Sequence, residues 1–254
     1  MAAELKHLFE QHGFSPVKAE LWSEFVHHVL SVFNLAADDL RKSENWEHFK
    51  QKRGALGRPR SRRRQGIAGL VPNEDAITSE LAPFIRHIRR TLPKNHFLRL
   101  NEVEFHAEEL VESDTRAGRH SRKTDFSVYA VSGEEGPEMA IEAKPLLKEA
   151  DINGRYLSQD GIGCFFDVDS PYTRGPLGGM LAYTMNGNGR SWRAEIRSAM
   201  SKYKPPVLYL DDAIVKGESE PLPFSRHRRS ALNLDPIAII HLELIFSTNI
   251  QERS

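Results

Sequence analysis

Two neighbouring stretches decide the fold: KTDFSVYAV at Lys123–Val131 and EMAIEAKPL at Glu138–Leu146. Both alternate between apolar and polar residues, which is typical of β-strands that pack one face against a core. Gly133 and Gly136 lie between them and favour a turn. The two stretches are therefore predicted to pair as an antiparallel hairpin.

The hairpin concentrates charged groups on one of its faces. Alternation puts Glu142 and Lys144 on the same face, and Asp125 is predicted to lie across from this pair. Two carboxylates that converge repel each other unless a cation lies between them. Carboxylate oxygens suit magnesium or manganese, and an amine beside the metal can hold a phosphate oxygen or orient a water molecule. This pattern indicates metal-dependent hydrolysis of phosphodiesters.

Asp125, followed seventeen residues later by Glu142-Ala143-Lys144, resembles the motif of the PD-(D/E)XK nuclease superfamily, although Thr124 stands where the motif carries proline. The resemblance implies a restriction-endonuclease-like fold. It also implies that Asp125 and Glu142 bind Mg²⁺ or Mn²⁺, with the Ala143 carbonyl as a further ligand. Lys144 would then position or activate water.

The resemblance extends from about Asn73 to Tyr203 and implies further site residues on two helices. A helix is expected to begin near Asn73 and to run through ITSELAPFIRHIRRTL. Its Glu80 matches the acidic residue that often joins such sites, as a second metal ligand. A second helix is expected over Lys148–Gln159, and Gln159 is the candidate polar accessory residue.

The rest of the chain predicts an α/β protein with a mixed sheet flanked by helices. Residues 1–53 are expected to form a small helical N-terminal region, 54–70 a basic linker, and 71–254 the nuclease-like domain. A further helix is expected over Trp192–Tyr203. Additional β-like stretches are His96–His106, Gly179–Met185, Val207–Leu210 and Ile237–Phe246.

Charge is balanced overall, with 35 basic and 35 acidic residues, but it is locally uneven. KRGALGRPRSRRR, at Lys52–Arg64, has no acidic residue, and Arg226–Arg229 forms another basic group. Such clusters favour contact with a phosphate backbone, although a solvated linker is the alternative. The expected nucleic-acid contacts are Arg58, Arg60, Arg62, Arg63, Arg64, Arg119, Arg122 and Lys123.

Composition narrows the class of protein. The chain has 254 residues and one cysteine, Cys164, so neither an internal disulfide framework nor a zinc site of several thiolates is expected. It contains no run of eighteen apolar residues and no signal-peptide pattern. A cytoplasmic protein without a membrane partner is expected.

The expected function is a metal-dependent nuclease, acting on DNA in preference to RNA, with a role in restriction or anti-phage defence. A separate motor or sensor subunit would control it in that role. Three alternatives stay open. The protein could be a non-catalytic nucleic-acid-binding or scaffolding subunit of the same fold, or an adaptor for an acidic protein partner. Glu142 and Lys144 could also form no more than a surface salt bridge. The sequence leaves the oligomeric state open.

Overall fold

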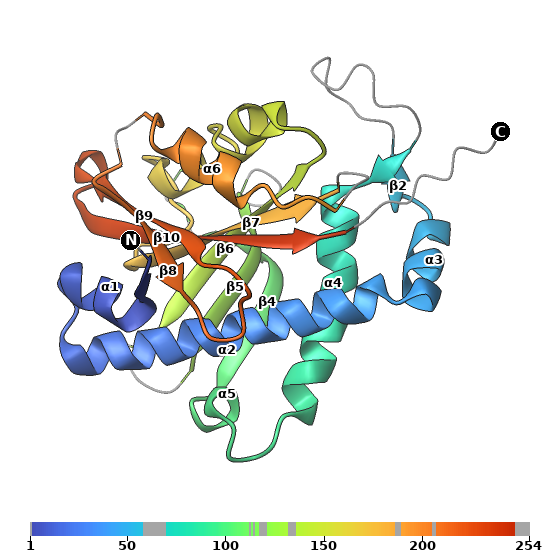
Figure 1. The fold of residues 1–254 in the computed structure, drawn as a ribbon, viewed down its shortest axis with the longest axis horizontal. Helices are drawn as coiled ribbons and strands as arrows, with labels where there is room; N and C mark the ends of the chain where they lie inside the picture. The colour runs from blue at the N-terminus through green and yellow to red at the C-terminus, as the bar shows by residue number, and fades with distance from the viewer. Residues whose placement is uncertain are drawn as a thin grey trace.

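The computed structural model describes residues 2–57, 70–111, 113, 115–116, 121–131, 136–185, 189–204 and 207–246. It is an α/β protein in which helices flank a mixed eight-stranded sheet, with an N-terminal helical region (Figure 1). This confirms the predicted fold class. Among the described residues, no helix combines the length and the apolar character needed to cross a membrane.

The large sheet has the strand order β1-β8-β9-β10-β7-β6-β5-β4. Strands β4, β5 and β6 pair antiparallel as a meander, and β6, β7 and β10 pair parallel. Strands β8, β9 and β10 pair antiparallel, and β1 pairs parallel with β8. The bounds are β1 (Ala2–Glu4), β4 (Val103–Leu110), β5 (Lys123–Ala130), β6 (Glu138–Leu146), β7 (Leu177–Thr184), β8 (Tyr209–Ile214), β9 (Leu222–Arg229) and β10 (Leu234–Ile245).

A second sheet has only two strands, β2 (Leu56–Gly57) and β3 (Val71–Pro72). The α-helices are α1 (Leu5–Gln11), α2 (Pro16–Arg41), α3 (Ser43–Gln51), α4 (Glu74–Thr91), α5 (Phe97–Leu100) and α6 (Arg193–Met200). Shorter turns are the π-helix η3 (Ile152–Tyr156) and the 3₁₀ helices η4 (Ile162–Phe166) and η5 (Ser230–Leu232).

The sheet separates two hydrophobic clusters. On the first face, α2 and α4 pack on the strands, and the rings of Phe33 and Phe126 lie 4.9 Å apart between centroids. On the second face, η3 and α6 pack with Tyr156 and Ile196 against Met180. In Figure 1, α2 is the long blue helix below the strands and α6 lies above them. Because β1 joins the sheet and α2 packs against it, the N-terminal helical region shares its core.

Two predicted elements differ from the structure. The stretch predicted as a strand at His96–His106 begins instead with α5, and β4 starts only at Val103. The helix predicted over Lys148–Gln159 is shortened to the π-helix η3, and the 3₁₀ helix η4 follows after Gly161. Gly161 helps to explain the break, because a Cβ there would lie 2.3 Å from the carbonyl oxygens of both Arg155 and Tyr156. The chain can turn back so closely only with glycine.

The basic group Arg226–Arg229 lies in β9, which the sequence did not reveal as a strand. Arg229 is only 2% exposed, and its guanidinium donates hydrogen bonds to the backbone carbonyls of Thr173, Arg174, Gly175 and Asp235. This arginine therefore holds the loop before β7. Its guanidinium donates to carbonyls of the protein itself, so Arg229 is not the surface phosphate contact that the charge pattern suggested.

Candidate metal centre

Three carboxylates from three separate elements meet beside Lys144. Glu74 comes from the first turn of α4, Asp125 from β5 and Glu142 from β6. One oxygen of each lies within 4.8 Å of the others, which makes the group a candidate metal site. The structure thus brings together Asp125, Glu142 and Lys144, as the sequence led us to expect, and adds Glu74.

The hairpin explains how Asp125 reaches Glu142. Phe126 pairs with Ile141 across β5 and β6, so the preceding residue of β5 lies opposite the following residue of β6. One Asp125 oxygen accepts a hydrogen bond from the Ala143 backbone N–H at 2.7 Å. Alternation sends Ile141 and Ala143 into the first hydrophobic cluster and leaves the charged side chains on the opposite face.

Lys144 acts as an internal counter-ion in this group. Its ammonium donates to Glu74 Oε1 at 2.5 Å, to the Ala143 carbonyl at 2.9 Å and to Glu142. The side chains of Glu142 and Lys144 are both buried. The pair is therefore not the exposed cross-strand salt bridge that was the alternative interpretation of the sequence. The expected role of the Ala143 carbonyl as a metal ligand stays a prediction.

Burial and mutual repulsion disfavour the ionised forms of Asp125 and Glu142. Burial, followed by the charge of Asp125, raises the pKa of Glu142 to about 9. Burial also raises the pKa of Asp125 to about 6, against the lowering effects of Lys144 and the Ala143 N–H. Burial alone would lower the pKa of Lys144, but the surrounding carboxylates, Glu142 first, outweigh it and raise that pKa. A proton therefore stays on the carboxylate group near neutral pH.

A divalent cation suits this donor set. All three ligands are carboxylate oxygens, which magnesium and manganese prefer. Metal–oxygen distances of about 2.0 to 2.6 Å place opposite ligands roughly 4 to 5 Å apart, and the 4.8 Å limit observed here is compatible with that span. Such a cation would also supply the positive charge that the retained proton now provides.

Glu80, the predicted ligand on the preceding helix, lies elsewhere. Its carboxylate accepts hydrogen bonds from Lys52 at 2.6 and 2.8 Å. Six residues separate Glu80 from Glu74, which corresponds to about 240° of rotation around α4 and about 9 Å along it. The helix therefore contributes Glu74 to the carboxylate group in place of Glu80. Glu74 continues the apolar stripe of Ile77 and Leu81 at helical spacing, and this was the missed signal.

Arg155 reaches the site from the segment for which Gln159 was proposed. Its Nη2 lies 3.4 Å from Glu74 Oε2, and about a third (35%) of its side chain is exposed. Gln159 is exposed in the turn after η3, with its side chain close to Gly163. The accessory residue next to the carboxylates is therefore an arginine, which the irregular π-helix directs toward α4.

The predicted nucleic-acid contacts are only partly within the described residues. Lys123 is exposed on β5, two residues before Asp125. Arg122 forms an ion pair with Asp167 at 2.7 Å, so its charge is partly compensated. The remaining candidates lie outside the described residues; they are Arg58, Arg60, Arg62, Arg63, Arg64 and Arg119.

Comparisons of the chain with protein-family models, with curated proteins and with solved structures found no match. The functional interpretation therefore depends on the geometry of the carboxylate group and on the surfaces around it.

Proposed function

We propose that the protein is a metal-dependent nuclease of the PD-(D/E)XK type that hydrolyses phosphodiester bonds, with DNA as the preferred substrate. One observation carries the proposal: Glu74, Asp125 and Glu142 converge within 4.8 Å, with the Lys144 ammonium in contact with two of them. The order of elements also supports it. A helix with a glutamate precedes the β4–β5–β6 meander, and β7 and α6 follow.

Each charged group has a distinct role in this proposal. Glu74, Asp125 and Glu142 would hold Mg²⁺ or Mn²⁺, which when bound lowers the pKa of water and stabilises negative charge on the phosphate. Lys144 keeps its positive charge at neutral pH because its pKa is raised, so it can donate to a phosphate oxygen or orient the attacking water. Arg155 can donate to a further phosphate oxygen through its exposed guanidinium edge.

The position of the basic segment supports a polyanionic substrate. Strands β2 and β3 pair with each other, so Gly57 and Val71 hold the two ends of the chain between them close together. Strand β3 ends one residue before Asn73, and Glu74 follows at the start of α4. The arginines at 58–64 thus belong to a segment that is followed, through β3, by Glu74 of the carboxylate group. A role in restriction or anti-phage defence with a motor or sensor subunit stays a prediction.

A cleavage assay tests the proposal. Purified protein is incubated with plasmid DNA and Mg²⁺ or Mn²⁺, alongside the variants Glu142→Gln and Lys144→Met. Each variant is expected to lower the cleavage rate by about 10²-fold or more, because each removes a charge that the reaction needs. Glu80→Gln is the matched control, since this carboxylate is paired with Lys52 and lies outside the site.

The result also separates the proposal from the non-catalytic alternative. DNA binding without metal-dependent cleavage would favour a binding or scaffolding subunit. Cleavage that persists unchanged in Glu142→Gln and Lys144→Met would assign the activity to another site or to a contaminant. Absence of salt-sensitive DNA binding would favour the adaptor, because contact with phosphates weakens steeply as salt is raised.

A further inference from the structure

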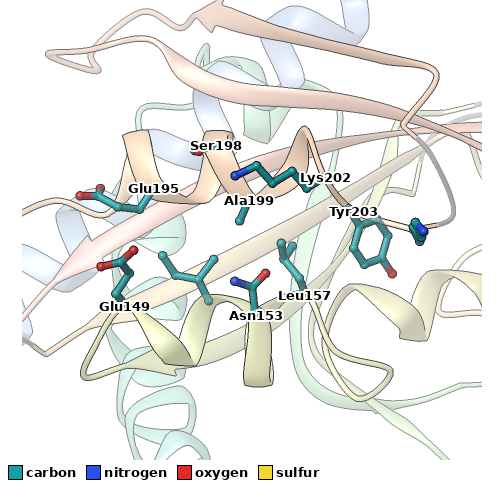
Figure 2. A pocket seen from close by; sticks show the side chains of 10 residues that line it. Glu149, Asn153, Leu157, Glu195, Ser198, Ala199, Lys202 and Tyr203 are labelled. Atoms are coloured by element: carbon teal, nitrogen blue, oxygen red, sulfur yellow. The ribbon is translucent and has the colours of Figure 1, made fainter.

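A groove of about 490 Å³ lies between η3 and α6 (Figure 2). Its volume is in the range of about 300 to 1,000 Å³ that small-molecule sites occupy. Ile152 and Leu157 give the groove an apolar floor, and both are buried in the second hydrophobic cluster. Asn153 of η3 and Ser198 of α6 are exposed along its walls. The groove therefore combines an apolar base with polar walls.

The two ends of the groove differ in charge. Figure 2 shows Glu149 and Glu195 at one end and Tyr203 at the other, with Lys202, two residues after the end of α6, above the gap. Glu195 forms an ion pair with Arg190, which compensates its charge. Lys202 is exposed, as is Lys204, which also lines the groove, and neither forms an ion pair with any described residue. The groove therefore carries uncompensated positive charge on Lys202 and Lys204, the two residues that flank Tyr203 in the sequence.

Tyr203 adds an aromatic ring beside these lysines. Its backbone N–H donates to the Met200 carbonyl at 3.1 Å, and its ring packs edge-on against the buried His227 at 6.0 Å between centroids. The ring is thus held in place at the end of α6. An ordered aromatic ring and two lysines that line the same groove suit a ligand that has both a planar base and a phosphate.

We propose that this groove binds one nucleoside monophosphate unit. Lys202 and Lys204 hold its phosphate, the base lies against Tyr203 and the apolar floor, and the Asn153 amide pairs with the edge of the base. The π-helix η3 links this groove to the carboxylate site, because Arg155, two residues after Asn153, contacts Glu74. Resting on the proposed nuclease function, the unit is a nucleotide of the substrate strand on the other side of η3 from the carboxylate site, because residues two apart on a helix project to opposite sides.

Binding to the metal-free protein tests this inference independently of cleavage. Isothermal titration calorimetry in EDTA compares AMP with two fragments. Ribose 5-phosphate lacks the base, and adenosine lacks the phosphate. AMP is expected to bind saturably and at least tenfold more tightly than either fragment, because each of its two parts contacts the groove. A short single-stranded oligodeoxynucleotide is expected to compete with AMP for the groove.

Variants of the groove locate the binding. The double variant Lys202→Gln/Lys204→Gln is expected to weaken AMP and oligonucleotide binding roughly tenfold or more. It is also expected to flatten the salt dependence of oligonucleotide binding, by about 0.7 in slope for each phosphate that the protein no longer neutralises. Asn153→Ala is expected to weaken AMP but not ribose 5-phosphate. Lys94→Gln, at an exposed lysine between α4 and α5, is the control and is expected to leave affinity unchanged.

Several outcomes would overturn the inference. These are no saturable AMP binding, equal binding of AMP and ribose 5-phosphate, or unchanged affinity in the double lysine variant. AMP binding that the oligonucleotide cannot displace would refute the assignment to the substrate strand and indicate a site for a free nucleotide. No groove binding with intact DNA cleavage would refute this inference alone. Groove binding without any cleavage would refute the nuclease proposal and the assignment to a substrate strand, and would leave nucleotide binding by the groove.

Discussion

Replacing Glu142 with glutamine should remove a pH dependence of stability that the wild-type carboxylate group creates. Glu142 lies buried beside Asp125, and its pKa rises from its ordinary value of 4.5 to about 9. Between these values the folded protein holds a proton that the unfolded chain releases. The stability that this proton gives is fully present below the lower value and is lost as pH rises toward the upper one. Glutamine resembles the protonated carboxyl group and has no proton to lose.

One proton changes the free energy of unfolding by about 1.4 kcal/mol per pH unit. From about pH 6 to about pH 8, metal-free wild type should therefore lose about 3 kcal/mol relative to Glu142→Gln. The range from about pH 6 to about pH 8 lies between the ordinary and the raised pKa of Glu142 and does not extend below the raised pKa of Asp125. Glu142 therefore dominates the pH dependence of stability in this range.

Urea denaturation in EDTA at several pH values measures this difference directly. Saturating Mg²⁺ or Mn²⁺ should reduce the difference, since the cation replaces the proton, and should stabilise wild type more at about pH 8 than at about pH 6. Equal pH slopes for wild type and Glu142→Gln in EDTA would refute the reasoning, because Glu142 would then already be ionised at neutral pH.

Three further substitutions test other parts of the structure. Arg229→Met should cost about 3 kcal/mol of unfolding free energy in urea, because it removes the donor to four part-buried backbone hydrogen bonds; a cost under about 1 kcal/mol would contradict this. Gly178→Ala should cost about 1 to 3 kcal/mol, since the new Cβ would lie 2.6 Å from the Phe165 ring, and an unchanged melting temperature would contradict that contact. Arg155→Gln should weaken DNA binding by roughly tenfold with Mn²⁺ affinity retained; equal DNA affinity would remove Arg155 from the phosphate site.

The hairpin was predictable because its information is local. Alternation in the two strands determines which side chains share a face, and the turn between them sets which strands pair. These two facts bring Asp125 to Glu142 and Lys144. Arg155 could not be predicted in the same way. The direction of its side chain depends on the π-helix η3, and the spacing of apolar residues in this segment does not indicate a π-helix.

Glu74 and Glu80 show where the prediction of the site failed. Both lie on one helix, and the residues alone do not say which turn faces the hairpin. The apolar stripe that includes Ile77 and Leu81 marks the buried side of α4, and its extension by one turn leads to Glu74. Glu80 instead pairs with Lys52, a partner from a distant element that no helical pattern could show.

The sequence analysis missed strand β9 for a related reason. Four consecutive basic residues resemble a surface cluster, yet His227 and Arg229 point inward while Arg226 and Arg228 alternate with them. Three of the four carbonyls that Arg229 binds lie more than fifty residues away along the chain. Burial of an arginine depends on such distant acceptors, so local composition could not show that Arg229 is unavailable for a phosphate contact.

Mn²⁺ binding to wild type, Glu74→Gln and Glu80→Gln is the most direct test of the central claim, that the first turn of α4 completes a carboxylate site with the hairpin. Calorimetric titration should show saturable binding to wild type, at least about tenfold weaker binding to Glu74→Gln, and wild-type affinity in Glu80→Gln. Weaker binding only in Glu80→Gln, or no saturable binding to wild type, would contradict the account.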